Sequence, residues 1–424
     1  MKLKTLTLLS SALLCASTLL SCSTDDSPVP EKEIEKGQEG FQTEPEEATP
    51  YESIMLDAPQ RKANEATTNF SYSLLRESFK QAQQRNCSPN VFISPLGVSN
   101  ILTMLANGAN EETLKEITDV LGADLNQLNS FYTLMADALP KADNQVTFSV
   151  ANSVWINNGF HPSELYMDLL KSRFDAESFI TNINTAEAKD AINQWCSDKT
   201  NAMIPEFLKR PLERCAMFLA NAMYFDGKWT DPFDPENNTF EPFEGSNKEV
   251  EMMHGNVGIH YSGLSGGELV SILYGNGTYS LNIYLPSEGV SIDQALESSD
   301  SYLRPARSGS CILTMPKFSF SYEEDTMDDI LKRLGINLLF NDGKSLSKIA
   351  NNLYCSFIKQ ATALEVSEAG AKAAAVTGAG MLESCGEPSF EPAIPEVKVD
   401  RPFIFSITEN SNGIVIFAGV MVTL

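Results

Sequence analysis

The chain has 424 residues, a length that suits two or three domains or one large mixed fold. Apolar residues make up 42% and charged residues 21%, so a substantial core can form and wholesale disorder is excluded. Acidic residues outnumber basic ones 56 to 31, which gives a net charge of -25. Such a charge repels phosphate, so we expect no nucleic-acid partner and no direct electrostatic docking on anionic lipid.

The first 21 residues predict an export signal. Two lysines precede an apolar run that is too short and too rich in serine for a good spanning helix. The run ends in Leu19-Leu20-Ser21-Cys22, which resembles a lipobox, and the acidic residues after it resemble the surface-export tags of Bacteroides-type lipoproteins. This resemblance implies a signal peptide over 1–21, a lipid on Cys22, and a surface-exposed outer-membrane lipoprotein of the cell envelope. An ordinary secretory signal with a chance cysteine is the alternative.

Residues 22–60 predict an acidic, disordered tether. This stretch is rich in acids and prolines and has almost nothing apolar enough to fold, so it is expected to lift a domain off the membrane. The folded part is predicted over residues 61–424.

The elements of the folded part follow from periodicity and capping. Apolar residues at helical spacing predict a first helix around Phe70–Phe79. Ser94-Pro95 and Asn110 are typical helix starts, and Gly122 is a typical helix end. The remaining prediction comprises strands at 146–155, 218–224, 281–285 and 312–320, helices at 186–199 and 326–334, and a hairpin of 403–407 with 414–422 around Asn412-Gly413. Strands and helices mix without βαβ regularity, which predicts one large α+β domain.

Catalytic and metal-binding patterns are weak. Gly263–Gly267 fits the G-x-S-x-G nucleophile elbow, but His161, His254 and His260 all precede Ser265, whereas the hydrolase order places the histidine after it. A glycine-rich hairpin loop explains this stretch better. The histidine spacing suits no metal, so we expect none. We also expect no catalytic residues and no cofactor. Six cysteines outside the signal and the lipobox lack CxxC spacing, and the sequence leaves their disulfide state open: Cys87, Cys196, Cys215, Cys311, Cys355 and Cys385.

The stretch from Glu365 to Asp400 carries the most information. An alternating strand pattern at 364–366 leads into Gly370 and an alanine-rich run. A flexible linker is odd inside a folded domain, and the glycines argue against a helix. A strand that slides into a sheet fits better, because one register holds only small or uncharged residues, while Lys372 falls in the other register and can face solvent. The inward-facing set is Ala371, Ala373, Ala375, Thr377, Ala379 and Met381.

At this point the sequence resembles the serpin family over residues 61–424. The motifs that carry the resemblance lie far apart and follow the family's order. They are Asn90-Val91-Phe92-Ile93-Ser94-Pro95, Asn221-Ala222-Met223-Tyr224-Phe225 with Gly227-Lys228-Trp229, Met315-Pro316-Lys317-Phe318, and Val399-Asp400-Arg401-Pro402-Phe403-Ile404-Phe405.

The resemblance implies a fold of three β-sheets and eight or nine helices, with an exposed reactive loop at about 368–398. It also implies a monomer that acts as a suicide-substrate inhibitor. A protease attacks the loop and forms an acyl-enzyme, and the cut loop then inserts into the main sheet and distorts the tethered protease. The alternative is a non-inhibitory serpin-fold binding protein whose loop is only a substrate.

The hinge and the reactive bond are placed by the same resemblance. The implied hinge consists of Glu368, Gly370, Ala371, Ala373, Ala374, Ala375 and Thr377. Ala371 stands where serine or threonine is usual, Lys372 where an acid is usual, and Gln360 where many members have histidine. The family's spacing places the reactive bond at Ser384–Cys385, with bonds after Leu382, Glu383 or Cys385 as alternatives. The implied targets are elastase-, chymotrypsin- or glutamyl-specific serine proteases, and also papain-like cysteine proteases.

Overall fold

The computed structural model describes residues 49–84, 90–255, 259–264, 266–298, 302–306, 309–341, 343–370 and 394–424. The predictions for the export signal, the lipidated Cys22, most of the tether and Cys87 lie outside these ranges. Within them, no helix combines the length and the apolar character needed to cross a membrane.

Helices dominate the first part of the chain, and their predicted ends are confirmed. The Ser94 hydroxyl accepts a hydrogen bond from the Gly97 N–H at 3.1 Å, and the Asn110 side chain accepts one from the Thr113 N–H at 2.8 Å. Gly122 ends its helix in the left-handed conformation with φ 74°. These helices are α1 (Ala58–Gln84), α2 (Pro95–Gly108), α3 (Glu111–Leu121), α4 (Leu125–Ala138) and α5 (Glu164–Phe174).

The described fold extends to the N-terminal side of residue 61, where the tether was predicted to end. Helix α1 begins at Ala58, where Asp57 and Gln60 exchange side chain to backbone hydrogen bonds of 2.8 Å. Leu56 is buried, and the Thr49 N–H donates to the Asn144 side chain at 3.0 Å. Residues 49–60 therefore belong to the fold, because contacts with distant residues hold a segment whose composition resembles a tether.

The largest sheet has six strands and contains the predicted C-terminal hairpin. Its hairpin strands pair from Phe403↔Met421 to Glu409↔Ile414, around the Asn412-Gly413 turn. The strand order is β1 (Val91–Ile93), β15 (Ile414–Met421), β14 (Phe403–Glu409), β9 (Tyr279–Pro286), β8 (Gly267–Tyr274) and β7 (Ile259–Leu264).

The predicted strand 312–320 is two strands of different sheets. Strand β10 (Ile312–Pro316) belongs to a four-stranded sheet, and β11 (Phe318–Glu324) pairs with β12 (Gln360–Val366). The chain changes sheets at Lys317, after a proline that has no N–H to continue a ladder. Strand order in the four-stranded sheet is β13 (Glu396–Lys398), β10, β6 (Glu249–Gly255) and β5 (Thr239–Pro242).

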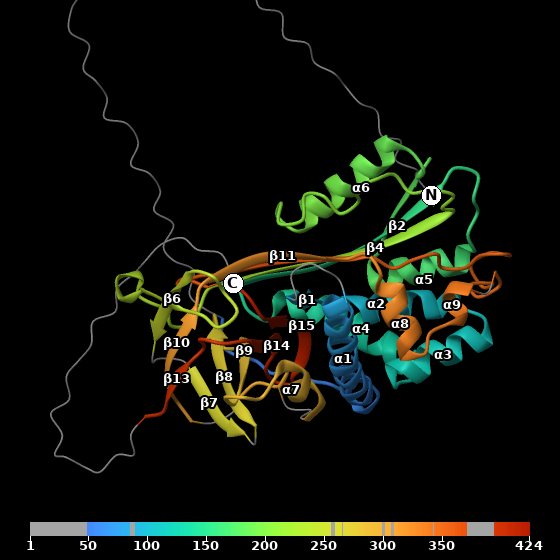
Figure 1. Cartoon of the computed structure of the whole chain (residues 1–424). Coiled ribbons are helices and arrows are strands. Elements are labelled where there is room, and N and C mark those ends of the chain that lie inside the picture. Colours follow the sequence, from blue (N-terminus) through green and yellow to red (C-terminus); the bar gives the residue numbers. More distant parts are fainter. Residues whose placement is uncertain are drawn as a thin grey trace, which may run out of the picture. The chain divides into compact units, whose positions relative to one another are not determined.

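A three-stranded sheet lies in the same layer as the β11–β12 pair. Figure 1 shows β11, β2 and β4 running together, with α6 (Ala186–Lys199) over one face. The predicted helix 186–199 is thus confirmed. The strand order is β3 (Glu177–Thr181), β2 (Val146–Asn157) and β4 (Met217–Gly227). The remaining helices are α7 (Ile292–Ser298), α8 (Met327–Leu334), α9 (Leu338–Asn341) and the 3-10 turns Leu139–Lys141 and Pro235–Asn237.

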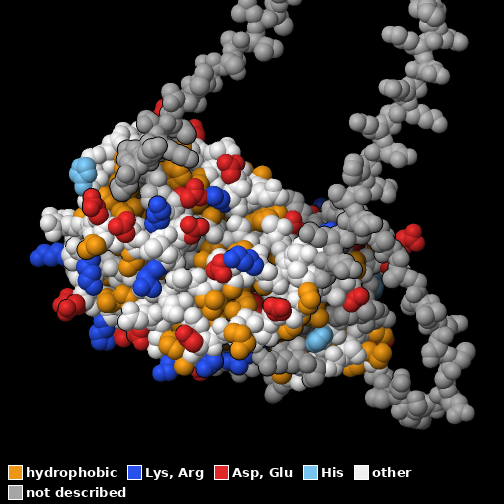
Figure 2. Space-filling view, turned by 180° about the vertical axis from the view of Figure 1, so that it is seen from behind, with side chains coloured by type: hydrophobic (Ala, Val, Ile, Leu, Met, Phe, Trp, Pro, Cys, Tyr) orange, Lys and Arg blue, Asp and Glu red, His pale blue; other side chains and the backbone are white. Residues whose placement is uncertain are grey.

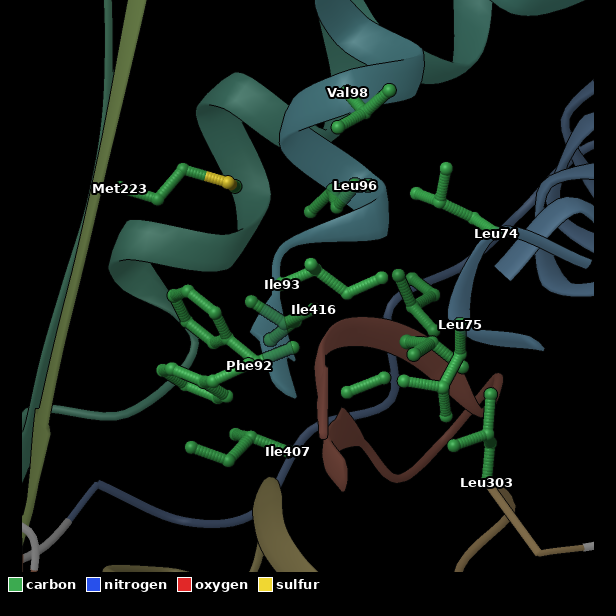
Figure 3. Packing of buried hydrophobic residues seen from close by; sticks show 14 of the residues in the cluster. Leu74, Leu75, Phe92, Ile93, Leu96, Val98, Met223, Leu303, Ile407 and Ile416 are labelled. Atoms are coloured by element: carbon green, nitrogen blue, oxygen red, sulfur yellow. The ribbon is translucent and has the colours of Figure 1, made fainter. Parts of the chain in front are cut away.

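Two buried clusters lie on the two faces of this layer. In the main core, Leu74 and Leu75 of α1 reach in from one side and Met223 of β4 from the other, toward the Phe92 strand (Figure 3). The opposite face carries a smaller cluster, which we name the α6 cluster. It contains Trp155 of β2, Ile192, Trp195 and Cys196 of α6, and Phe218, Ala220 and Ala222 of β4.

The charged side chains are interspersed on the face shown in Figure 2, where acidic, basic and hydrophobic residues alternate over the surface. Large exposed apolar side chains are scattered singly along different elements, such as Leu165 on α5 and Phe240 on β5. Scattered apolar residues of this kind are ordinary on a folded surface.

Candidate functional site: a seam between two strands and the loop beside it

Strands β4 and β12 lie next to each other without forming a ladder. Each is the outer strand of its own sheet among the described residues. Near their starts, the Phe218 ring of β4 stacks on the ring of Phe357, three residues before β12, with centroids 5.9 Å apart. Beyond their last residues, the Trp229 N–H donates to the Ala369 carbonyl at 3.0 Å. The two strands therefore run in the same direction, and we name the boundary between their facing edges the seam.

Both sides of the seam present the same two faces. On β4, Met223 and Phe225 pack into the main core, whereas Ala220 and Ala222 pack into the α6 cluster. On β12, Leu364 and Val366 belong to the main core, and Ala361 and Ala363 pack against the α6 cluster. A strand placed between them would find one apolar face on each side.

The chain leaves β12 through a tight reversal that needs glycine. The N–H groups of Ser367 and Gly370 donate to each other's carbonyls at 3.0 and 3.2 Å. Gly370 has φ 138°, and a Cβ there would lie 2.1 Å from the Gly227 carbonyl oxygen. Gly370 also forms an antiparallel bridge with Lys228, just beyond β4. The predicted hinge glycine thus lies against the upper end of the seam.

Glu368 is anchored at the same place. Its carboxylate, only 12% exposed, accepts hydrogen bonds from Lys317 Nζ at 3.0 Å and from Asn238 Nδ2 at 2.6 Å. Burial opposes ionisation, but backbone and side-chain hydrogen bonds outweigh it and lower the pKa of Glu368. The pKa of Lys317 is raised, chiefly by its hydrogen bond to Glu368.

The Trp229 indole completes this anchor by donating to the Ser367 carbonyl at 2.8 Å. The sequence pointed to Glu368 but not to Lys317 and Asn238 as its partners. Lys317 and Trp229 belong to the motifs that resemble the serpin family, whereas no sequence pattern indicates a role for Asn238. Three separate segments meet here, so only the tertiary structure brings these groups together.

Gln360 ties the lower half of β12 to the start of α2. Its side-chain oxygen accepts from the Ser94 N–H at 3.0 Å, and its Nε2 donates to the Ser94 carbonyl at 2.9 Å. The Ser94 hydroxyl donates in turn to the Ile416 carbonyl at 2.8 Å. An amide has no titration near neutral pH, so this pair of bonds does not respond to protonation as a histidine at the same place would.

The rest of the predicted site lies outside the described residues. This applies to the hinge residues Ala371, Ala373, Ala374, Ala375 and Thr377 and to the bond residues Leu382, Glu383, Ser384 and Cys385. Beyond them the chain joins another sheet, where the Ile312 N–H donates to the Pro395 carbonyl at 2.8 Å and β13 follows. The ends of this segment are therefore held by separate sheets.

Other candidate chemistry finds no matching geometry. Ser265 lies outside the described residues, but Leu264 ends β7 and pairs with Gly267 at the start of β8, so the described residues on its two sides are strands of one hairpin and not the strand and helix of a nucleophile elbow. His254 lies 2.9 Å from the Thr239 hydroxyl and 3.0 Å from the Thr314 hydroxyl. The described ranges contain no group of three or more metal-ligating side chains.

Comparison with known proteins decides the family. The model for "Serpin (serine protease inhibitor)" matches residues 65–424. The chain belongs to the serpin family. A serine protease inhibitor of Cyanea capillata is 32% identical to this serpin, and the match covers 78% of the chain and 91% of that protein. Glia-derived nexin of Rattus norvegicus is 31% identical, over 80% of the chain and 89% of the relative.

Solved structures confirm the predicted α+β serpin fold. The thermophilic serpin tengpin in its native state has a TM-score of 0.76 and 26% identity, covering 89% of this chain and 97% of that chain. Human thyroxine-binding globulin has a TM-score of 0.74 at 22% identity, covering 86% and 98%, which shows the shared fold alone. In this serpin the two sheets β3-β2-β4 and β11-β12 lie on the two sides of the seam.

Proposed function

We propose that this serpin is a suicide-substrate inhibitor of serine proteases that traps the acyl-enzyme when its cleaved loop inserts at the seam. Papain-like cysteine proteases are further targets, because they also form an acyl-enzyme. The observation that carries the proposal is the pair of facing, unladdered strands β4 and β12 directly beside the hinge. An edge of this kind accepts an added strand through its free backbone groups.

The pairing around Gly370 supports insertion of the alanine-rich run. Gly370 bridges Lys228 on one side and Ser367 on the other, both in antiparallel fashion. If the loop continues both pairings as antiparallel ladders, one with β4 and one with β12, Ala373 lies opposite Phe225 of β4 and Leu364 of β12. Those two side chains belong to the main core. The two ladders therefore agree that the odd-numbered residues from 371 to 381, all small or uncharged, face the core.

The even-numbered residues of the loop would face the opposite side of the sheet, toward the α6 cluster. The same ladders bring Lys372 between Asp226 of β4 and Glu365 of β12, on the side of the α6 cluster. Glu365 is exposed and Asp226 is half-buried. The lysine that replaces the family's usual acid thus falls between two acids, so cross-strand charge favours the inserted state.

The energy for trapping comes from the new strand. About a dozen residues gain backbone hydrogen bonds at roughly 1 kcal/mol net each, which gives a drive on the order of 10 kcal/mol. The native state is then metastable and is held by a kinetic barrier until the loop is cut. Attack by the protease serine at Ser384–Cys385 releases the Cys385 side as an amine and leaves the Ser384 side esterified to the enzyme.

The decisive experiment uses the mature chain with Cys22→Ser and a panel of elastase-, chymotrypsin-, glutamyl- and papain-like proteases. We expect an SDS-stable complex with at least one of them. We also expect a released C-terminal peptide whose measured mass corresponds to a chain that starts at Cys385. Peptides beginning at Glu383, Ser384 or Gly386 would move the bond to one of its alternatives. Clean cleavage without a complex across the panel would favour the non-inhibitory binding protein.

We also propose that Cys22 carries the lipid that anchors this inhibitor to the cell envelope. The lipobox-like stretch and the acidic residues after it support this placement. Metabolic labelling with a fatty acid should mark the full-length chain but not its Cys22→Ser variant. A chain that is exported and cleaved but carries no label would be an ordinary secreted protein.

A further inference from the structure

A small cavity lies at the lower end of the seam, where the chain enters β4 and β12. Its volume is about 180 Å³, and it is lined by residues 214–219, by residues 352–359, and by Ile101 and Leu105 of α2. Cys215 lines it from the β4 side and Cys355 from the β12 side. Two thiols from opposite sides of the seam therefore share one cavity.

The surrounding contacts place the two cysteines at the same level. Phe218 follows Cys215 by three residues, Phe357 follows Cys355 by two, and their rings stack with centroids 5.9 Å apart. A disulfide needs a Cα separation of about 4.4–6.8 Å. The shared cavity and the stacked rings bring the two segments together at this level, so the two thiols lie on facing segments.

Both cysteines are held in place and are reduced in the structure. Asn184 accepts from the Cys215 N–H at 2.8 Å and donates to the Cys215 carbonyl at 3.1 Å. The Cys355 N–H donates to the Leu339 carbonyl at 3.0 Å. Burial raises the pKa of the Cys215 thiol to about 11 and that of the Cys355 thiol to about 12, so the pair reacts faster as pH rises.

We propose that Cys215 and Cys355 form a thiol pair whose oxidation ties β4 to β12 and stops full loop insertion. The oxidant is a small-molecule disulfide. One cysteine thiolate attacks a sulfur of the reagent and releases one reagent thiol; the other thiolate then displaces the second reagent thiol. Two protein thiols are oxidised to one disulfide, and one reagent disulfide is reduced to two thiols.

The effect on trapping rests on the proposed function. If the loop continues the antiparallel ladders that start at Gly370, Leu382 and Glu383 reach the level of Cys355 and Cys215. A covalent link there leaves the upper seam free but blocks the last residues of the inserting strand. The loop is still cut, but the acyl-enzyme is not carried the full distance, so the serpin becomes a substrate.

The test treats the Cys22→Ser chain with oxidised glutathione at pH 8.5. We expect a peptide that links Cys215 to Cys355 in the mass spectrum of a digest, and a loss of at least tenfold in complex yield that dithiothreitol restores. Cys215→Ser and Cys355→Ser should each abolish the response. Cys311→Ser is the matched control and should keep it, since burial raises the pKa of that buried thiol to about 11 as well.

Two results would overturn the proposal: no linked peptide after oxidation, or a linked protein that still forms complex in full yield. Loop insertion can also be measured without a protease complex, as the rise in the thermal midpoint of the serpin after its loop is cleaved. The disulfide should suppress that rise. If the reduced protein shows the rise but forms no complex, the inhibitor proposal fails while the thiol pair is still tested by this second readout.

Discussion

Ala373→Arg tests loop insertion most directly. The ladders that start at Gly370 place residue 373 opposite Phe225 and Leu364, which are 6% and 3% exposed in the main core. An arginine there buries a charge without a partner, at a cost of about 3–5 kcal/mol. This is a third to a half of the drive on the order of 10 kcal/mol for the new strand.

The cost also slows insertion. If half of it, about 2 kcal/mol, is felt in the transition state, insertion slows about 30-fold. Deacylation then competes, and we expect Ala373→Arg to shift the product from trapped complex to cleaved serpin. The assay is the number of serpin molecules consumed per protease molecule inhibited, measured by titration with densitometry of complex and cleaved product.

Lys372→Arg is the matched control, because it places the same side chain one residue earlier in the outward register, between Asp226 and Glu365. It should inhibit like the wild type. If Ala373→Arg inhibits as well as this control, the inward register and the insertion step it belongs to would both be refuted.

Three further predictions concern the anchor of the hinge and the start of α2. Glu368→Gln should lower the thermal midpoint at pH 7, because it removes the ion pair with Lys317. The pKa of this carboxyl is lower in the folded state than its unfolded-state value of about 4.3, so the ion pair stabilises the fold above that unfolded-state pKa. The difference in midpoint from the wild type should vanish as pH falls through the folded-state pKa. A pH-independent difference would contradict this assignment. Gly370→Ala should destabilise the native state by about 1–3 kcal/mol in urea unfolding, because of its φ of 138° and the close carbonyl; an unchanged midpoint would mean that the reversal relaxes freely. Gln360→Ala removes two hydrogen bonds to Ser94 and should cost about 1–3 kcal/mol. Gln360→His should make stability depend more steeply on pH between 5 and 8 than that of the wild type.

Local patterns in the sequence were sufficient for many elements. The caps at Ser94 and Asn110, the left-handed glycine at Gly122 and the turn at Asn412-Gly413 depend on side chains within a few residues of the backbone groups they satisfy. Such local signals can be recognised in the sequence without a tertiary structure, so these helix ends and the hairpin were predicted correctly. The separated motifs likewise identified the serpin family.

Long-range contacts decided the rest. The start of the fold before residue 61 depends on Leu56 and Thr49 meeting distant residues, and the split of 312–320 depends on which strands lie beside each half. A period-two pattern shows which residues of a strand share a face, but it does not show which strand lies beside them.

The same limit applies to the functional site. The sequence determined that a stretch of small residues after Gly370 could become a strand, because alternation and the absence of proline are local properties. Only the tertiary structure showed that β4 and β12 face each other without a ladder, that Lys317 and Asn238 hold Glu368, and that two cysteines share a cavity below. These features join segments that lie far apart in the chain, and their energy arises from burial and pairing that exist only once the chain has folded.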